Sequence, residues 1–324
     1  MGGWARANAT PLLVFLASRT WLLAIVAASM LLVPDAQNLP GSTPAITISP
    51  WPRALLVDPW THWDGEWYRR IAVDGYTNVA LDESGQRDTA FFPLYPLAIR
   101  FAAAVVGDAD LAGILVSNAA LLATLIVLHR LARLHFEPAT ASRALLLLAF
   151  FPFSYFLGAM YSESLFLLAV VCAFYQAERW RWWAAGLAGA FAGLARVTGI
   201  LIVLGLLLLY LEQRRFDVRK CRWDCVWILA ALLGPMLHAA FLQARFGDAF
   251  LFIRSQYVPG WGAGVGLQLA LDTVRNVMTG SLGGDSIFPL MHALHLLVWC
   301  LALAISFLAW GRPRIAYGVW ATLM

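Results

Sequence analysis

Charged residues are scarce in this chain of 324 residues, since Asp, Glu, Lys and Arg together make up 13% of it and hydrophobic residues 61%. The mean hydropathy of +0.70 is far from that of a soluble domain, so a water-soluble globular protein is not expected. The net charge of +4 does not indicate nucleic-acid binding, because the Lys and Arg residues cluster in short loops, where they set membrane orientation. We expect no nucleic-acid partner.

Cysteine is also rare, and metal-binding patterns are missing. Two of the four cysteines lie inside apolar segments and two, Cys221 and Cys225, lie in a basic loop, so no disulfide framework follows. No His or second Cys pair near that loop completes a zinc site, and His292 and His295 have no carboxylate beside them. Arg254, Gln256, Trp261 and the glycines of residues 260–266 form a polar, flexible outer loop that could close over a substrate, but the glycine spacing is not that of a phosphate-binding loop. We expect no metal and no cofactor.

Apolar runs, in contrast, are abundant. They cover residues 11–33, 91–106, 111–128, 144–157, 165–177, 184–194, 197–211, 226–242 and 287–310, with another from 315 onward. Several are long enough to cross a bilayer, and the shorter ones require tilting or partial insertion. They predict an all-α, polytopic membrane helix bundle that forms one domain over residues 1–324. The final run stops without a polar flank, so we expect the C-terminus to be incomplete.

The basic loops predict the orientation of the bundle. Arg and Lys gather at residues 129–143, 179–181, 214–222 and 312–314. The number of apolar runs between these loops places all of them on the same side of the membrane, which their positive charge predicts to be the cytoplasmic side. The long polar stretch 34–90 then becomes the first outer loop. The stretch 34–90 can lie outside and the loop 129–143 inside only if residues 91–106 do not cross the membrane completely. We therefore expect that run to be short, re-entrant or interfacial. The predicted location is the plasma (inner) membrane, multi-pass, with the polar loops of interest on the extracytoplasmic side.

The first outer loop contains the most informative motif, His62-Trp63-Asp64-Gly65-Glu66-Trp67-Tyr68. Its aromatic residues have helical spacing, which predicts a short amphipathic helix in the membrane interface. Asp64 and Glu66 are two residues apart and point in different directions on a helix. We therefore expect one carboxylate to take part in the chemistry and the other to support it. The alternative is a solvated interfacial helix with an aromatic belt.

Two further charges lie beside apolar runs on the same predicted side. Glu163, within Tyr161-Ser162-Glu163-Ser164, is costly near a membrane unless it has a partner. Its local alternative is a helix N-terminus with Ser162 as the capping residue. Arg196 lies among small apolar residues, and its guanidinium group matches a carboxylate or a phosphate. Its alternatives are a pair with Glu163 or a side chain that reaches to the surface.

Taken together, these motifs resemble a known family, the second mannosyltransferase of glycosylphosphatidylinositol synthesis and its bacterial relatives, within the GT-C superfamily. The resemblance is carried in order by His62-Trp63-Asp64, Glu66, Ile71-Ala72, Gly75-Tyr76, Ala90-Phe91-Phe92-Pro93 with Pro96, Pro152, Tyr161 to Phe166, and Arg196 with Gly199. Each motif is weak alone, whereas their order and spacing are specific. The resemblance weakens after about Gly247.

The resemblance implies a GT-C type fold, a polyprenyl-phosphate sugar donor, normally mannose, and a lipid or glycan acceptor hydroxyl on the outer face. It also places the essential aspartate in the first outer loop, at Asp64. Inverting transfer needs a base beside the acceptor, which Asp64 supplies, and stabilisation of the departing phosphate, which we assign to Arg196. Glu163 and Glu66 would orient the acceptor or hold Arg196.

Beside those two carboxylates, His62, Trp63 and Tyr161 complete the predicted substrate-binding set, and the scheme requires no metal. Two hypotheses from other classes remain open. A transporter or flippase of lipid-linked sugars predicts inverted repeats, broken helices and a site near the bilayer midplane. A non-catalytic assembly factor would tolerate the loss of Asp64, Glu163 and Arg196 together.

Overall fold

A computed structural model describes residues 8–32, 50–80, 83, 85–258 and 313–323, with isolated residues between 275 and 308. Within this part of the chain the secondary structure is entirely helical. Most of the predicted run 287–310, the glycines of residues 260–266, and His292 with His295 lie outside the described residues.

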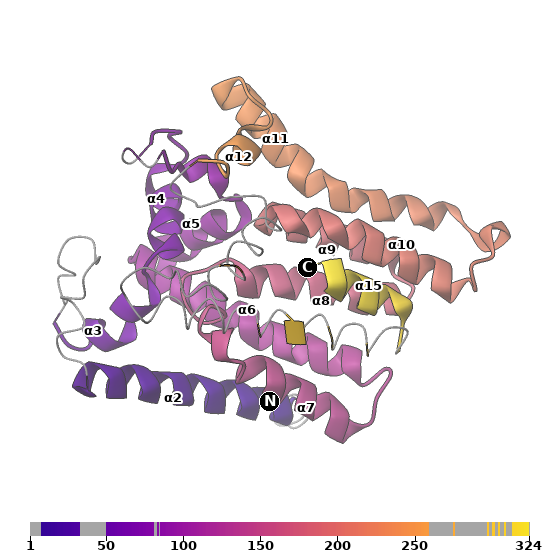
Figure 1. The fold of residues 1–324 in the computed structure, drawn as a ribbon, viewed down its shortest axis with the longest axis horizontal. Coiled ribbons are helices and arrows are strands. Elements are labelled where there is room, and N and C mark those ends of the chain that lie inside the picture. The colour runs from indigo at the N-terminus through magenta and orange to yellow at the C-terminus, as the bar shows by residue number, and fades with distance from the viewer. Residues whose placement is uncertain are drawn as a thin grey trace.

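The body of the molecule is a bundle of helices that run along its long axis (Figure 1). They are α2 (Ala9–Leu32), α6 (Ala109–Ala132), α7 (Pro138–Ala149), α8 (Glu163–Glu178), α9 (Trp182–Ala195), α10 (Ile202–Gln213), and α11 (Leu233–Phe246) with the 3₁₀ helix η7 (Trp223–Leu232) before it. Within the described residues, three helical stretches are long and apolar enough to cross a membrane, namely Ala9–Leu32, Ala109–Ala132 and Trp223–Phe246. The all-α, polytopic membrane fold predicted from the sequence is confirmed.

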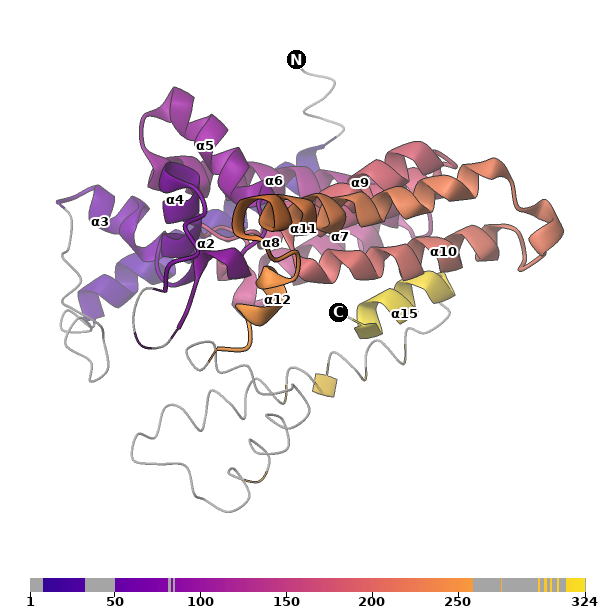
Figure 2. The same cartoon turned by 90° about the horizontal axis from the view of Figure 1, so that it is seen from above.

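Short helices gather at one end of this bundle (Figures 1 and 2). They are α3 (Arg53–Leu56), η2 (Asp58–Trp60), α4 (Asp64–Asp74), η3 (Asp88–Ala90) and α5 (Leu94–Val106). With 13 residues, α5 extends only about 20 Å, which is too short for a complete crossing. It ends at Gly107, whose φ is +82°. Asp108 then caps α6 by accepting a hydrogen bond from the Leu111 amide, at 2.9 Å.

The predicted amphipathic helix is present as α4, but its apolar face contacts protein. Trp67, Tyr68 and Ile71 are at most 7% exposed and pack against Tyr95 of α5 and neighbouring residues of α6. Aromatic side chains bury large areas and contribute strongly to the energy of such a protein core. Trp63, by contrast, is 68% exposed. The α4 helix is therefore fixed rigidly to the bundle.

The apolar run 144–157 does not form one helix. Helix α7 ends at Ala149, and a short 3₁₀ helix, η4 (Pro152–Tyr155), follows. Pro152 lacks an amide hydrogen and disfavours the α conformation of the residue before it, so the helix stops there. The chain then turns back towards the start of α8.

The opposite end of the bundle is held by buried carboxylates between the basic loops. Glu178 accepts hydrogen bonds from Arg314, at 3.1 and 3.2 Å, and from the Tyr317 hydroxyl, at 2.9 Å. The Glu212 carboxylate accepts from the first two amides of α15 (Ile315–Leu323), at 2.9 and 3.0 Å. Arg314 and the start of α15 therefore lie against the ends of α8 and α10, away from α3, α4 and α5.

The helix α9 packs closely against η7 and α11 through its small residues. A Cβ atom added to Gly189 would lie within 2.7 Å of the Ala231 side chain, and one added to Gly193 would lie within 2.5 Å of Pro235. Larger residues at these positions would separate the helices. This contact sets the position of the α9 terminus, where Arg196 follows.

Candidate active site

A cavity of about 410 Å³ lies between α4, the segment after η3 and the junction of α9 with the next 3₁₀ helix, η5 (Val197–Leu201). Its lining contains charged, hydroxyl, amide and aromatic side chains. The lining residues are Asp64, Tyr68, Ala90, Phe91, Phe92, Ala195, Arg196, Val197, Thr198 and Gln256. The structure thus places the predicted base and the predicted phosphate ligand in the wall of one cavity.

Asp64 is the first residue of α4 and reaches the cavity from a strained turn. Trp63 precedes it with φ +56° and ψ −116°, a conformation that a non-glycine residue adopts only when its surroundings enforce it. Burial, followed by the negative charge of Glu163, raises the pKa of Asp64 to about 6, although Arg196 acts in the opposite direction. The carboxylate is therefore a stronger base than an ordinary aspartate and is still mostly ionised at pH 7.

Arg196 follows the last residue of α9 in an extended conformation, with φ −153° and ψ 150°. Its Nη1 atom donates to the Glu163 carboxylate and to the Ser162 hydroxyl. Both of these hydrogen bonds come from a single nitrogen, so other donors of the guanidinium group remain for an anion in the cavity. The pair with Glu163 that the sequence left open as an alternative is present, and it orients Arg196 towards the cavity that also contains Asp64.

Ser162 has a different role from the helix cap that its position predicts. It occupies the N-cap position of α8, but its side chain makes no capping hydrogen bond. Its hydroxyl instead accepts from Tyr68, at 2.8 Å, and from Arg196, at 3.3 Å. Glu163 does lie in the first turn of α8, where the helix dipole favours a carboxylate. Ser162 therefore joins α4 to Arg196.

The turn that carries Asp64 is anchored to the segment before α8. The Tyr161 hydroxyl donates to the His62 carbonyl, at 3.2 Å, and also hydrogen-bonds the backbone of Asp64. The Met160 amide donates to the Trp60 carbonyl, at 2.8 Å. These contacts fix the position of the carboxylate relative to Glu163, which begins the next helix.

The other predicted site residues occupy different places. Tyr161 is 5% exposed, and with the His62 backbone it forms the support beneath Asp64. Glu163 lies behind Arg196, whereas Trp63 is exposed at the turn. Glu66 is exposed on another face of α4 and is not among the residues that line the cavity. The two acidic residues of the motif thus point in different directions, as helix geometry requires.

Three polar lining residues were not among the predicted site residues. Tyr68 lies one helical turn after Asp64, so helical spacing could have identified it. Thr198 carries no comparable local signal, whereas Gln256 belongs to the polar outer loop that the sequence indicates as able to close over a substrate. Gln256 reaches the cavity because its amide group donates to the Ala90 carbonyl, at 3.0 Å. Within the described residues no three His, Cys, Asp or Glu side chains are close enough to hold a metal ion.

Helices, cavity and charges together define an α-helical membrane protein with an acid and an arginine in one cavity at a bundle end. The family model of the mannosyltransferase (PIG-V) family matches residues 10–246, and the chain belongs to that family. The GPI alpha-1,6-mannosyltransferase 2 of Rattus norvegicus is 32% identical over 182 residues, which are 52% of this chain and 35% of the relative. The same-named proteins of Mus musculus and Homo sapiens are 34% and 31% identical, over 46% and 53% of this chain and 31% and 36% of the relatives.

The matched part of the chain spans about a third of the length of these curated relatives. No solved structure matches the chain. The resemblance inferred from the ordered motifs is nevertheless confirmed, because the family match covers every one of those motifs.

Proposed function

We propose that this protein is a membrane glycosyltransferase that moves a sugar, mannose in the first instance, from a polyprenyl-phosphate donor to an acceptor hydroxyl on the extracytoplasmic face. The observation that carries the proposal is the pairing of Asp64, with its raised pKa, and Arg196 in the wall of one cavity. Membership of the mannosyltransferase (PIG-V) family supports the choice of sugar. The names of its relatives support transfer to a hydroxyl group.

The chemistry follows from these two groups. The acceptor oxygen attacks the anomeric carbon from the side opposite the phosphate, which inverts the configuration there. Asp64 takes the proton of the hydroxyl as the new bond forms. The bond to the phosphate oxygen breaks, and the polyprenyl phosphate leaves with the electron pair and an additional negative charge. Arg196 stabilises that charge, and its attraction is stronger in a cavity with little water.

The location of these groups favours transfer over transport. Asp64 begins α4, Glu163 begins α8 and Arg196 follows α9, so all three lie at helix ends next to the loop helices. A transporter site is expected at breaks within helices near the bilayer midplane. A site at the end of the bundle is open to an acceptor that approaches from the aqueous side.

Transfer is tested with the purified full chain in lipid nanodiscs. The assay supplies polyprenyl-phosphate mannose carrying a ¹³C-labelled sugar together with a lipid extract as the acceptor source, and mass spectrometry follows the label. We expect labelled product from this donor and none from a nucleotide-linked mannose, because the proposed site stabilises a single lipid phosphate. Movement of the intact donor across the bilayer without a labelled product would indicate a flippase and contradict the proposal.

The pH dependence of kcat/KM provides a second test. Asp64 must be ionised to accept a proton, so kcat/KM should fall below an apparent pKa of about 6, by about tenfold per pH unit. Glu163→Gln should shift this acid limb to lower pH, because the Glu163 charge raises the pKa of Asp64 and is lost in this variant. An acid limb that does not move in this variant would exclude Asp64 as the titrating base.

A further inference from the structure

A second cavity lies on the other side of one wall of the proposed transfer site. Its volume is about 420 Å³, and it is lined by Ile71, Gly75, Tyr76, Pro93, Pro96, Leu97, Arg100, Leu194, Leu237, His238 and Phe241. Pro93 and Leu194 line this cavity, whereas their chain neighbours Phe92 and Ala195 line the transfer cavity. At both places, neighbouring residues of the chain line different cavities, so the two cavities are separated there by only one layer of residues.

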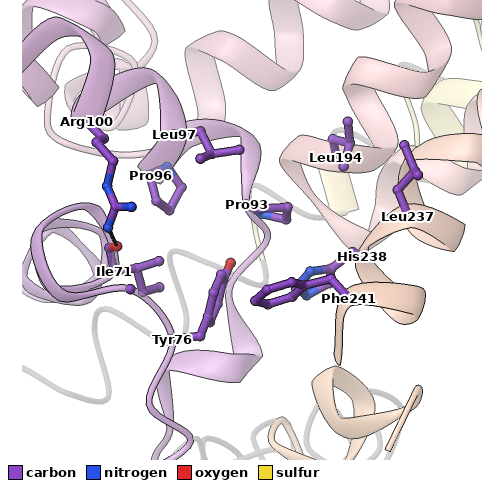
Figure 3. A pocket seen from close by; sticks show the side chains of 11 residues that line it. Ile71, Tyr76, Pro93, Pro96, Leu97, Arg100, Leu194, Leu237, His238 and Phe241 are labelled. Carbon is purple, nitrogen blue, oxygen red and sulfur yellow. Dashed lines mark hydrogen bonds between the residues drawn. The ribbon is translucent and has the colours of Figure 1, made fainter. Parts of the chain in front are cut away.

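His238 differs from the other polar lining residues of this largely apolar cavity because its ring nitrogens lack hydrogen-bond partners among the described residues. Figure 3 shows it pointing from α11, beside Phe241, toward Tyr76. The side chain is 1% exposed, and neither of its ring nitrogens has a hydrogen-bond partner among the described residues. Its neighbours are rings, with centroids 4.6 Å away at Phe92 and 5.8 Å away at Tyr76. A buried imidazole without partners is costly and requires an explanation.

The other polar side chains of the lining, Tyr76 and Arg100, do not supply the missing hydrogen bonds. The Tyr76 hydroxyl donates to the Phe91 carbonyl, at 2.8 Å. The Arg100 guanidinium donates to the Ala72 carbonyl, at 2.6 Å, and to the carbonyl of Ile71, at 3.3 Å. Among the described residues, neither group therefore supplies a partner for His238, and a molecule that enters the cavity would meet its unpaired ring nitrogens.

We propose that this cavity, the His238 cavity, binds a neutral acyl lipid whose hydroxyl or ester oxygen hydrogen-bonds His238 and whose hydrocarbon chain occupies the apolar space. A neutral imidazole offers one donor and one acceptor, and a hydroxyl group matches both. A polyprenyl chain has no such group, and a phosphate placed at His238 would lose its hydration among aromatic rings. The site is separate from Asp64 and Arg196, and its occupancy does not depend on the transfer reaction.

Binding is tested with a monoacylglycerol that carries a photoreactive diazirine in its acyl chain. The purified full chain in nanodiscs is irradiated with this probe, and the labelled peptides are mapped by mass spectrometry. We expect label on the peptides that contain Leu97 and Leu237. His238→Phe should reduce this label about fivefold, which is the loss of affinity expected when one hydrogen bond is removed. His129→Phe, which removes a half-buried histidine near the inner end of α6, should leave it unchanged.

A second pair of variants tests the cavity without altering the histidine. Leu237→Trp places a larger ring at the cavity wall and should abolish the label. Leu233→Trp, one helical turn earlier on the exposed face of α11, should not. The proposal is overturned if wild type and His238→Phe are labelled equally, or if a diazirine hydrocarbon without oxygen labels the same peptides as strongly. It is also overturned if unlabelled polyprenyl phosphate displaces the probe better than unlabelled monoacylglycerol, since the cavity would then hold the donor chain.

Discussion

Asp64→Asn should lower sugar transfer by about 10²- to 10⁴-fold, the range in which a positioned base contributes to a reaction. The amide keeps the size of the side chain but cannot accept the acceptor proton at neutral pH. The loss should appear in kcat measured with saturating donor, because Asp64 is not assigned to donor binding. Asp74→Asn is the matched control, since Asp74 ends the same helix, is exposed and lies outside the cavity lining.

The same substitution should stabilise the protein. The folded-state pKa of Asp64 is about 6, against an ordinary aspartate value of 3.8, so the native state holds more protons than the unfolded state between these pH values. The stability of the wild-type protein therefore falls as the pH rises through about 4 to 6, by up to about 3 kcal/mol. The Asn variant lacks this loss and should unfold at a higher temperature at pH 7, as measured in detergent by near-ultraviolet circular dichroism.

A variant that is both inactive and less stable than wild type at pH 7 would contradict this account, because the aspartate would then be a structural group. A variant that is active and more stable would remove Asp64 from the chemistry but retain its costly burial. The expected combination, an inactive and stabilised protein, indicates a charged group kept at the expense of stability.

The sequence predicted the chemical components of the site because each has a local signal. A carboxylate in an aromatic motif and an arginine among small apolar residues are both costly near a membrane, and the position of the basic loops on one side of the membrane placed them at the same end. Pro152 was also a local signal, and the prediction of one apolar run over 144–157 overlooked it. The roles of Asp64, Glu66, Glu163 and Arg196 remain predictions.

The sequence could not predict contacts between segments far apart in the chain. Gln256 enters the cavity because α12 (Leu251–Arg254) packs beside η3, where the hydroxyls of Thr89 and Ser255 are 2.7 Å apart. The His238 cavity exists because α11 lies against the segment between α4 and α5. A histidine in an apolar helix has no pattern that reveals whether its nitrogens find partners, since that depends on the packed neighbours.

Arg196→Gln should lower kcat by about 10²- to 10³-fold, the loss typical when one group that stabilises a developing negative charge is removed. Arg196→Lys should recover only part of this activity. Lysine keeps the positive charge but lacks the planar fork that lets Arg196 bond Glu163 and Ser162 while it meets a phosphate. Kinetics with saturating donor and acceptor measure the effect on kcat.

A structural role for the same arginine predicts a different pattern, because Arg196→Gln also leaves Glu163 half-buried without its cation, at a cost of about 1–3 kcal/mol in stability. Adding Glu163→Gln removes that unpaired charge, so the double variant should regain most of the lost stability. If Arg196 served only to neutralise Glu163, activity would return together with stability. If Arg196 stabilises the departing phosphate, the double variant should fold as well as wild type while its kcat stays within about threefold of that of Arg196→Gln.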